Sequence, residues 1–326
     1  MKKIMLFMLA FITVVTAASC QYESQAIVIA EGDWDSNRFY NEVVKFILEE
    51  GYDKEVEVTK VGTETMKLGL IDGSIDLNLE TWSANMPSYE QDIKDGYYEE
   101  LGVNFDDNYQ GLYIPAYVQE ENPGLVSIKD LPDYKHLFPD PDNSSWNVED
   151  DKAVVYGGPS SWGASNFFKN KFENSTDYPE LVANFEFRFI ENTATLNTTI
   201  VNAFNNNEPW VGYYWEPTDI MGQYDMVLLT DDLEFNSETG TGNMPTTDVT
   251  IVATDGFKEE HEDAAEFLSK MKTSSAVVNN VLAYMTENEL DTYDAAIWWL
   301  KENIDVWSTW VTEDAKELIE TALKDL

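Results

Sequence analysis

The chain has 326 residues, of which 43% are hydrophobic and 13% aromatic, and it carries 61 acidic against 20 basic side chains for a net charge of −41. This length favours two lobes, and this apolar content excludes a disordered acidic chain. So few basic residues in so negative a field exclude a nucleic-acid-binding surface and disfavour an anionic membrane face. A carboxylate-rich surface is typical of proteins from a salty medium and says little about function.

The N-terminus predicts export. Lys2 and Lys3 precede an apolar run at 4–15 that is too short to span a membrane, and small residues follow it. We therefore expect residues 1–20 to be a secretory signal peptide. Cys20, the only cysteine, resembles the lipidated cysteine of a bacterial lipobox, although Ala17 stands where leucine is usual. Ordinary cleavage without a lipid is the alternative.

Strand and helix patterns alternate after this leader. The expected elements are, in order, a strand at 26–30, a helix that Ser36 caps and that ends near Gly51, a strand at 56–58, a helix with Met66, Leu70 and Ile71 facing inward, and a strand at 74–79. Such alternation predicts a parallel α/β lobe with its ligand crevice beyond the carboxyl ends of the strands. Trp34 and Trp82 fall at such ends.

A similar unit recurs later in the chain. A strand at 153–156 leads through two glycines and a proline to Trp162, and a strand at 208–214 leads to Trp215. The extended stretch 247–253 is expected to cross back to the first lobe. Helical patterns fill the remaining C-terminal part.

Tryptophans in loop-like contexts at strand ends are the most informative residues. Indole faces that surround one point attract a cation such as a quaternary ammonium, and each wall of a desolvated cage contributes about 1–2 kcal/mol. Trp82, Trp162 and Trp215 could thus supply much of a micromolar affinity, which corresponds to about 8 kcal/mol. The alternative is packing, because most tryptophans are buried for that reason. Four others lie in a C-terminal helical pattern and are expected in the core: Trp298, Trp299, Trp307 and Trp310.

Enzyme signatures are missing. The two histidines, His136 and His261, have no nucleophile motif near them, and the chain has no phosphate-binding loop or zinc spacing. Asp140 and Asp142 lie in a polar loop without the turn glycine of a hand-type calcium site, which favours a solvated loop. We therefore expect no catalytic residues, no metal and no cofactor.

Several segments, in the same order and spacing, resemble the substrate-binding proteins of glycine betaine/proline-type ABC transporters. The matching segments are 34–36, 69–77 with 80–82, 110–118, 128–131, 156–159, 162–163, 211–218 and 295–303. The resemblance implies an α/β class II periplasmic-binding fold with its ligand in the cleft between two lobes. It divides the chain into a first lobe of 21–115 and 250–326 and a second lobe of 116–249, with two crossings as the hinge.

The resemblance also implies the site residues. The cage consists of Trp82 from the first lobe with Trp162 and Trp215 from the second, and Trp34 is a further wall. Gly163 and Ala164 offer backbone N–H groups to a ligand carboxylate. Tyr117 and Tyr214 either border the pocket or pack in the core. A helix beginning near Trp162 would favour an anion there. Some betaine binders place a histidine a few residues beyond a cage tryptophan; here Met86 lies beyond Trp82.

The expected function is an exported, monomeric receptor that captures glycine betaine or a related quaternary ammonium solute and presents it to an ABC permease. The alternatives are a choline or carnitine receptor, a sugar receptor, and a secreted hydrolase with a carboxylate pair. Because the amides of Gly163 and Ala164 can hold a ligand carboxylate, we expect glycine betaine to bind more tightly than choline. These amides do not titrate, so the affinity for glycine betaine should change little between about pH 5.5 and 7.5.

Overall fold

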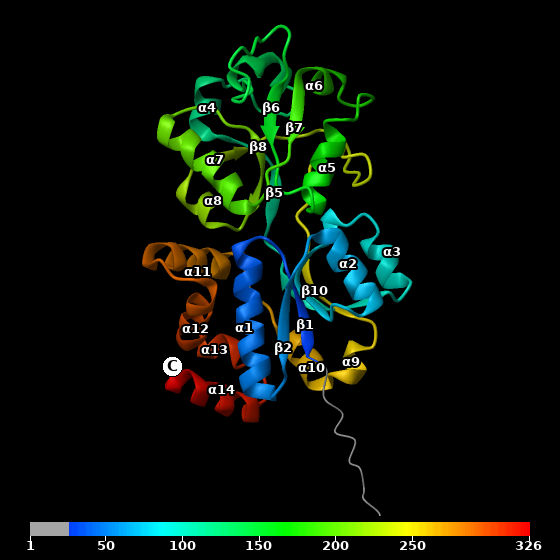
Figure 1. The fold of residues 1–326 in the computed structure, drawn as a ribbon, viewed down its shortest axis with the longest axis vertical. Helices are drawn as coiled ribbons and strands as arrows, with labels where there is room; N and C mark the ends of the chain where they lie inside the picture. The colour runs from blue at the N-terminus through cyan, green and yellow to red at the C-terminus, as the bar shows by residue number, and fades with distance from the viewer. Residues whose placement is uncertain (1–25) are drawn as a thin grey trace, which may run out of the picture.

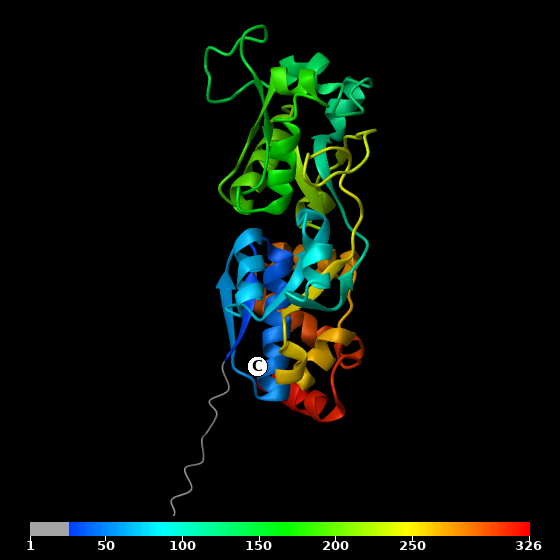
Figure 2. The same ribbon diagram turned by 90° about the vertical axis from the view of Figure 1, so that its right-hand side faces the viewer.

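The computed structural model describes residues 26–326, which form two α/β lobes, one above the other in Figure 1. The expected signal peptide and Cys20 lie outside these described residues. The molecule is elongated along the line that joins the lobes, and the chain crosses between them along one side (Figure 2). From residue 26 onward, no helix combines the length and apolarity that a bilayer span requires.

The first lobe contains a five-stranded sheet with the order β2-β1-β3-β10-β4. Its strands are β1 (Ile27–Glu31), β2 (Val56–Lys60), β3 (Leu77–Trp82), β4 (Tyr98–Phe105) and β10 (Val249–Thr254). β1 pairs in parallel with β2 and β3, whereas β10 runs antiparallel between β3 and β4. β3 begins three residues later than predicted, because Ile75 still donates its N–H to Gly69 at the end of the preceding helix. β10 returns to the first lobe as predicted.

Helices cover both faces of this sheet (Figure 1). They are α1 (Asp35–Tyr52), α2 (Thr63–Asp72), the short 3-10 helix η1 (Ser83–Asn85), α3 (Tyr89–Lys94), α9 (Phe257–Glu260), α10 (Glu262–Lys270), α11 (Ser275–Asn288), α12 (Thr292–Glu302), α13 (Ile304–Trp307) and α14 (Glu313–Asp325). α1 packs against the C-terminal helices α12 and α14. The core of this lobe is therefore built from both ends of the described chain.

Several side chains of the first lobe differ from the sequence prediction. Trp34, not Ser36, is the N-cap of α1; Ser36 lies inside the helix, and its hydroxyl donates to Glu80 instead. Ile71 is exposed although it was expected to face inward, because it lies at the end of α2 beyond the buried Leu70. Of the four C-terminal tryptophans, three are buried as predicted, and Trp298 is half-buried.

The second lobe contains a five-stranded sheet with the order β7-β6-β8-β5-β9. Its strands are β5 (Tyr109–Pro115), β6 (Ala153–Tyr156), β7 (Phe185–Arg188), β8 (Gly212–Glu216) and β9 (Met226–Leu228). Residues 109–115, which the sequence analysis assigned to the first lobe, form β5 and pair with β8 and β9. Hydropathy alone does not reveal this membership, because it depends on which strand satisfies the backbone N–H and C=O groups of β5.

Helices pack around this second sheet as well. They are α4 (Ala116–Glu121), the 3-10 helix η2 (Leu131–Leu137), α5 (Gly163–Lys171), α6 (Pro179–Asn184), α7 (Thr193–Asn206) and α8 (Asp219–Gln223). The chain passes between the lobes after β4 and again before β10. Asn108 joins these two crossings, since its side-chain amide donates to the Thr247 carbonyl and accepts from the Thr247 N–H. The crossings therefore lie side by side.

Candidate ligand-binding site

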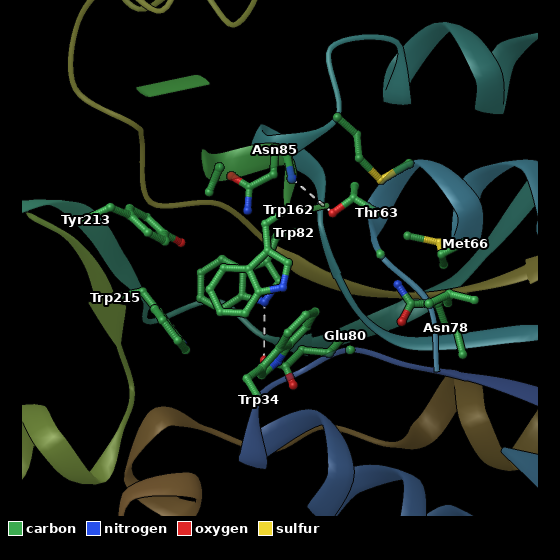
Figure 3. A pocket seen from close by; sticks show the side chains of 17 residues that line it. Trp34, Thr63, Met66, Asn78, Glu80, Trp82, Asn85, Trp162, Tyr213 and Trp215 are labelled. Carbon is green, nitrogen blue, oxygen red and sulfur yellow. Dashed lines mark hydrogen bonds between the residues drawn. The ribbon is translucent and has the colours of Figure 1, made fainter. Parts of the chain in front are cut away.

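A pocket lies between the lobes, and residues of both lobes line it (Figure 3). The first lobe contributes Trp34, Thr63, Asn78, Glu80, Trp82 and Asn85 among others, and the second lobe contributes Trp162, Gly163, Ala164, Tyr213 and Trp215. Trp82 ends β3, Asn85 follows it in η1, and Thr63 begins α2 after β2, so these residues lie at the carboxyl edge of the parallel strands, where the crevice was expected.

Four tryptophans line the pocket: Trp34, Trp82, Trp162 and Trp215. Trp162 stands almost perpendicular to Trp34, with ring centroids 5.6 Å apart at 87°, and to Trp215, at 5.2 Å and 85°. Trp82 approaches from the end of β3 (Figure 3). Indole planes set at right angles around one space form a box rather than a stack. Because Trp34 contacts Trp162 across the lobes, the box is complete only when the lobes are together.

Tyr213 also lines the pocket and was missed by the sequence analysis. Its ring stacks on Trp215 with centroids 5.9 Å apart and planes at 18°. The strand pattern could have indicated Tyr213, because alternate residues of a strand point to the same face and Trp215 lies two positions after Tyr213 in β8.

Two expected tyrosines do not line the pocket. Tyr214 lies between Tyr213 and Trp215 in β8 and therefore points to the opposite face, where its hydroxyl donates to Asn197 at 2.8 Å. The hydroxyl of Tyr117 donates to the Glu208 carbonyl at 2.6 Å, and its ring packs against Phe204. Both belong to the packing of the second lobe, which was the other interpretation of these residues.

The start of α5 touches the first lobe beside the cage. Gly163 and Ala164 line the pocket, as expected. The N–H of Gly163 donates to Oγ1 of Thr63 at 3.0 Å, and the N–H of Thr63 donates to the Ser161 carbonyl at 2.9 Å. One of the two amides that the resemblance assigned to a ligand carboxylate is therefore already bonded to a hydroxyl of the other lobe.

Glu80 places a buried carboxylate in the pocket wall. It accepts hydrogen bonds from the Ser36 hydroxyl at 3.0 and 3.1 Å and from the Trp82 indole N–H at 3.2 Å. Burial raises the pKa of Glu80 to about 7, and hydrogen-bond donors, including the Trp34 indole, oppose this rise. The Trp34 N–H nevertheless has no well-formed hydrogen bond, so Ser36 and Trp82 are the partners that hold the carboxylate. Because acidic residues are so abundant, no local sequence pattern singles out Glu80.

Among residues 26–326, no basic side chain lines this pocket. His136 lies in η2 and His261 directly after α9, and neither lines it. Asp35, at the start of α1, pairs with Arg38 at 2.7 Å and also lies outside the lining. Within residues 26–326, no cluster of histidine, cysteine, aspartate or glutamate is arranged to hold a metal ion.

Comparison with known families identifies the chain. The family model for the substrate-binding domain of ABC-type glycine betaine transport systems matches residues 25–302. The chain belongs to this family. Its members are extracytoplasmic proteins that bind solutes for transport, and they are not enzymes. This membership confirms the expected class of protein.

Solved structures similar to this chain include three relevant examples. An ABC-transporter choline-binding protein in complex with choline superposes with a TM-score of 0.75 at 17% identity and covers 91% of this chain and 98% of its own. A glycine betaine/L-proline-binding protein from Borrelia burgdorferi has a TM-score of 0.72 at 19% identity, with 90% and 100% covered. Lactococcal OpuAC, closed on glycine betaine, has a TM-score of 0.69 at 16% identity, with 88% and 100% covered. These likenesses confirm the two-lobed class II fold.

Proposed function

We propose that this protein is an extracytoplasmic receptor that captures a quaternary ammonium solute in a cage of Trp34, Trp82, Trp162 and Trp215 and delivers it to an ABC permease. The observation that carries the proposal is the arrangement of perpendicular indoles from both lobes around a pocket without basic side chains. Such a box attracts a cation that cannot form hydrogen bonds, and it offers no counter-charge to a purely anionic ligand.

Closure of the lobes and ligand capture are coupled in this proposal. A ligand that touches walls from both lobes has more favourable contacts in the closed state and therefore shifts the population toward it. Two contacts between the lobes support the closed arrangement. Thr193, at the start of α7, donates its N–H to Asp33 at 3.0 Å, and Gly163 donates to Thr63. The permease would then bind the closed, loaded form.

The test is a thermal-shift and calorimetric screen of purified protein with glycine betaine, proline betaine, choline, carnitine and a set of sugars. Quaternary ammonium compounds should raise the melting temperature, because a ligand at 100 times its Kd stabilises the native state by about 2.7 kcal/mol. Sugars should leave it unchanged. Stabilisation by a sugar alone, or by none of these compounds, would contradict the proposal.

We also propose that the exported protein is anchored through a lipid on Cys20 and works as a monomer. The charged start, the apolar run and the single cysteine support the anchor. Mass spectrometry of protein from the membranes of its own cells should find a mature N-terminus at Cys20 with a diacylglycerol adduct. Cleavage without the adduct would disprove the lipid, and an intact Met1 would disprove export.

A further inference from the structure

We propose that Glu80 determines specificity in this site: its carboxylate favours a full cation such as choline over a zwitterion such as glycine betaine, and capture of the cation releases a proton. This inference rests on the proposed function. It reverses the ligand order expected from the sequence, which relied on the amides of Gly163 and Ala164.

The geometry isolates the charge of Glu80 beneath the cage. Its side chain is 1% exposed and lies next to Trp34 and Trp82 (Figure 3). The partners of its carboxylate are neutral donors, the Ser36 hydroxyl and the Trp82 indole N–H, and no basic side chain of the described part of the chain lines the pocket. A negative charge in such a place is costly until a cation arrives. A quaternary ammonium in the box would supply the missing counter-charge.

The carboxylate of Glu80 also influences the ligand indirectly, through the indole of Trp82. Its indole N–H donates to Oε1 of Glu80 at 3.2 Å, while its ring forms one wall of the cage. An ionised acceptor polarises the donor to which it is bonded. An ionised Glu80 therefore makes the ring of Trp82 more negative and a better partner for a cation. A protonated Glu80 loses both effects.

Two buried tyrosines near Glu80 stay neutral in the pH range where Glu80 titrates. Burial, more than any other cause, raises the pKa of Tyr40 on α1 well above its usual value, and the negative charge of Glu80 adds to this rise. Burial also raises the pKa of Tyr213, across the pocket on β8. Both tyrosines thus stay neutral. The acidic groups at the start of α1, Asp33 and Asp35, are paired with Arg38.

The direction of the pH effect follows from the charge of the ligand. Glu80 of the free protein has a pKa of about 7, and a bound cation stabilises the ionised form and so lowers this pKa. Affinity for a cation therefore reaches its plateau above about pH 7 and falls as the pH decreases. The carboxylate of a zwitterion is repelled by ionised Glu80, which offsets the attraction of its ammonium group. The affinity for a zwitterion therefore increases little, or decreases, as the pH rises.

The first experiment uses the wild-type protein alone. Titration calorimetry with choline chloride and with glycine betaine at about pH 6, 7 and 8, in buffers of different ionisation enthalpy, reports both affinity and proton release. We expect choline to bind at least fivefold more tightly at about pH 8 than at about pH 6, with up to half a proton released near pH 7. Glycine betaine should bind more weakly than choline at about pH 8, and its affinity should change less than twofold between about pH 6 and 8.

The second experiment compares Glu80→Gln with Glu90→Gln, which removes the same formal charge from an exposed position on α3. Glu80→Gln should lower the choline affinity at about pH 8 by tenfold or more and abolish its pH dependence, and Glu90→Gln should do neither. If Glu80→Gln does not fold, as judged by thermal unfolding, the proton release of the wild type decides.

The outcomes separate the two proposals. A wild type that binds none of the quaternary ammonium compounds of the screen at any pH refutes the receptor function, and the role of Glu80 with it. A wild type that binds choline equally at all three pH values without proton release, or a folded Glu80→Gln that binds choline as tightly as wild type, refutes the role of Glu80 alone.

Discussion

Trp162 is the residue that joins the cage. It makes edge contacts with Trp34 of the first lobe and with Trp215 of the second. Trp162→Ala should lower the affinity for a trimethylammonium ligand by tenfold or more, about 1.4 kcal/mol, because a wall of the box is lost. Isothermal titration of the folded variant measures this change.

Trp298→Ala is the matched control for this prediction. Trp298 is half-buried and stacks on Tyr284 with centroids 3.7 Å apart, away from the pocket. Its loss should reduce stability and leave the intrinsic affinity unchanged. Equal affinities of wild type and Trp162→Ala would disprove the cage.

Glu80 should also make the stability of the free protein depend on pH. Folding raises the pKa of this group from 4.5 to about 7, so the native state binds the proton more tightly than the unfolded chain. The resulting contribution to stability is complete below about pH 4.5 and is lost as the pH rises through about 7, a change of about 3 kcal/mol.

Urea unfolding of wild type and Glu80→Gln at about pH 4.5 and 8 measures this contribution. The free energy of unfolding of the variant, relative to wild type, should rise by about 3 kcal/mol between the two pH values. Glu90→Gln, with its exposed side chain, should show no such rise. A constant difference between wild type and Glu80→Gln would mean that Glu80 titrates normally.

At the scale of elements, the contact between α5 and η1 limits how closely the lobes approach. Gly163 is the first residue of α5, and a Cβ atom there would lie 2.0 Å from the backbone oxygen of Asn85 in η1. A helix accepts alanine more readily than glycine, so the clash is between lobes and not within α5. Gly163→Ala should therefore fold but fail to close.

Ligand affinity and small-angle scattering report this effect. Gly163→Ala should weaken ligand binding by tenfold or more, about 1.4 kcal/mol, and small-angle scattering should show no compaction when ligand is added. Gly222→Ala in α8 is the control, because no heavy atom lies within 4 Å of its added Cβ. Wild-type affinity in Gly163→Ala would show that the bound state does not use this contact.

At the scale of the whole molecule, the net charge of −41 predicts dependence on salt. Like charges repel across the compact surface, and salt screens them over a Debye length that falls from about 30 Å at 0.01 M to about 3 Å at 1 M. The melting temperature should therefore rise with NaCl over this range. KCl of equal ionic strength should give the same curve, and a melting temperature independent of both salts would contradict the repulsion.

The sequence by itself determined the class of fold and indicated the tryptophans that line the pocket. Strand and helix periodicity set the order of β1, α1, β2, α2 and β3, because each pattern buries one face of its own element. Tryptophans at strand ends pointed to the pocket for a similarly local reason. Parallel strands bring their carboxyl ends to one edge, so Trp34 and Trp82 had to lie near each other.

Only the tertiary structure decided which groups share the pocket and how strongly burial shifts the pKa of Glu80. The membership of β5 in the second sheet depends on strand pairing between segments a hundred residues apart. Ser36 resembles a helix cap until β3 brings Glu80 against it. Glu80 is one acid among 61 acidic residues, and what sets it apart is burial without a basic partner. Burial and charge pairing arise from contacts between distant segments, so no local pattern encodes them.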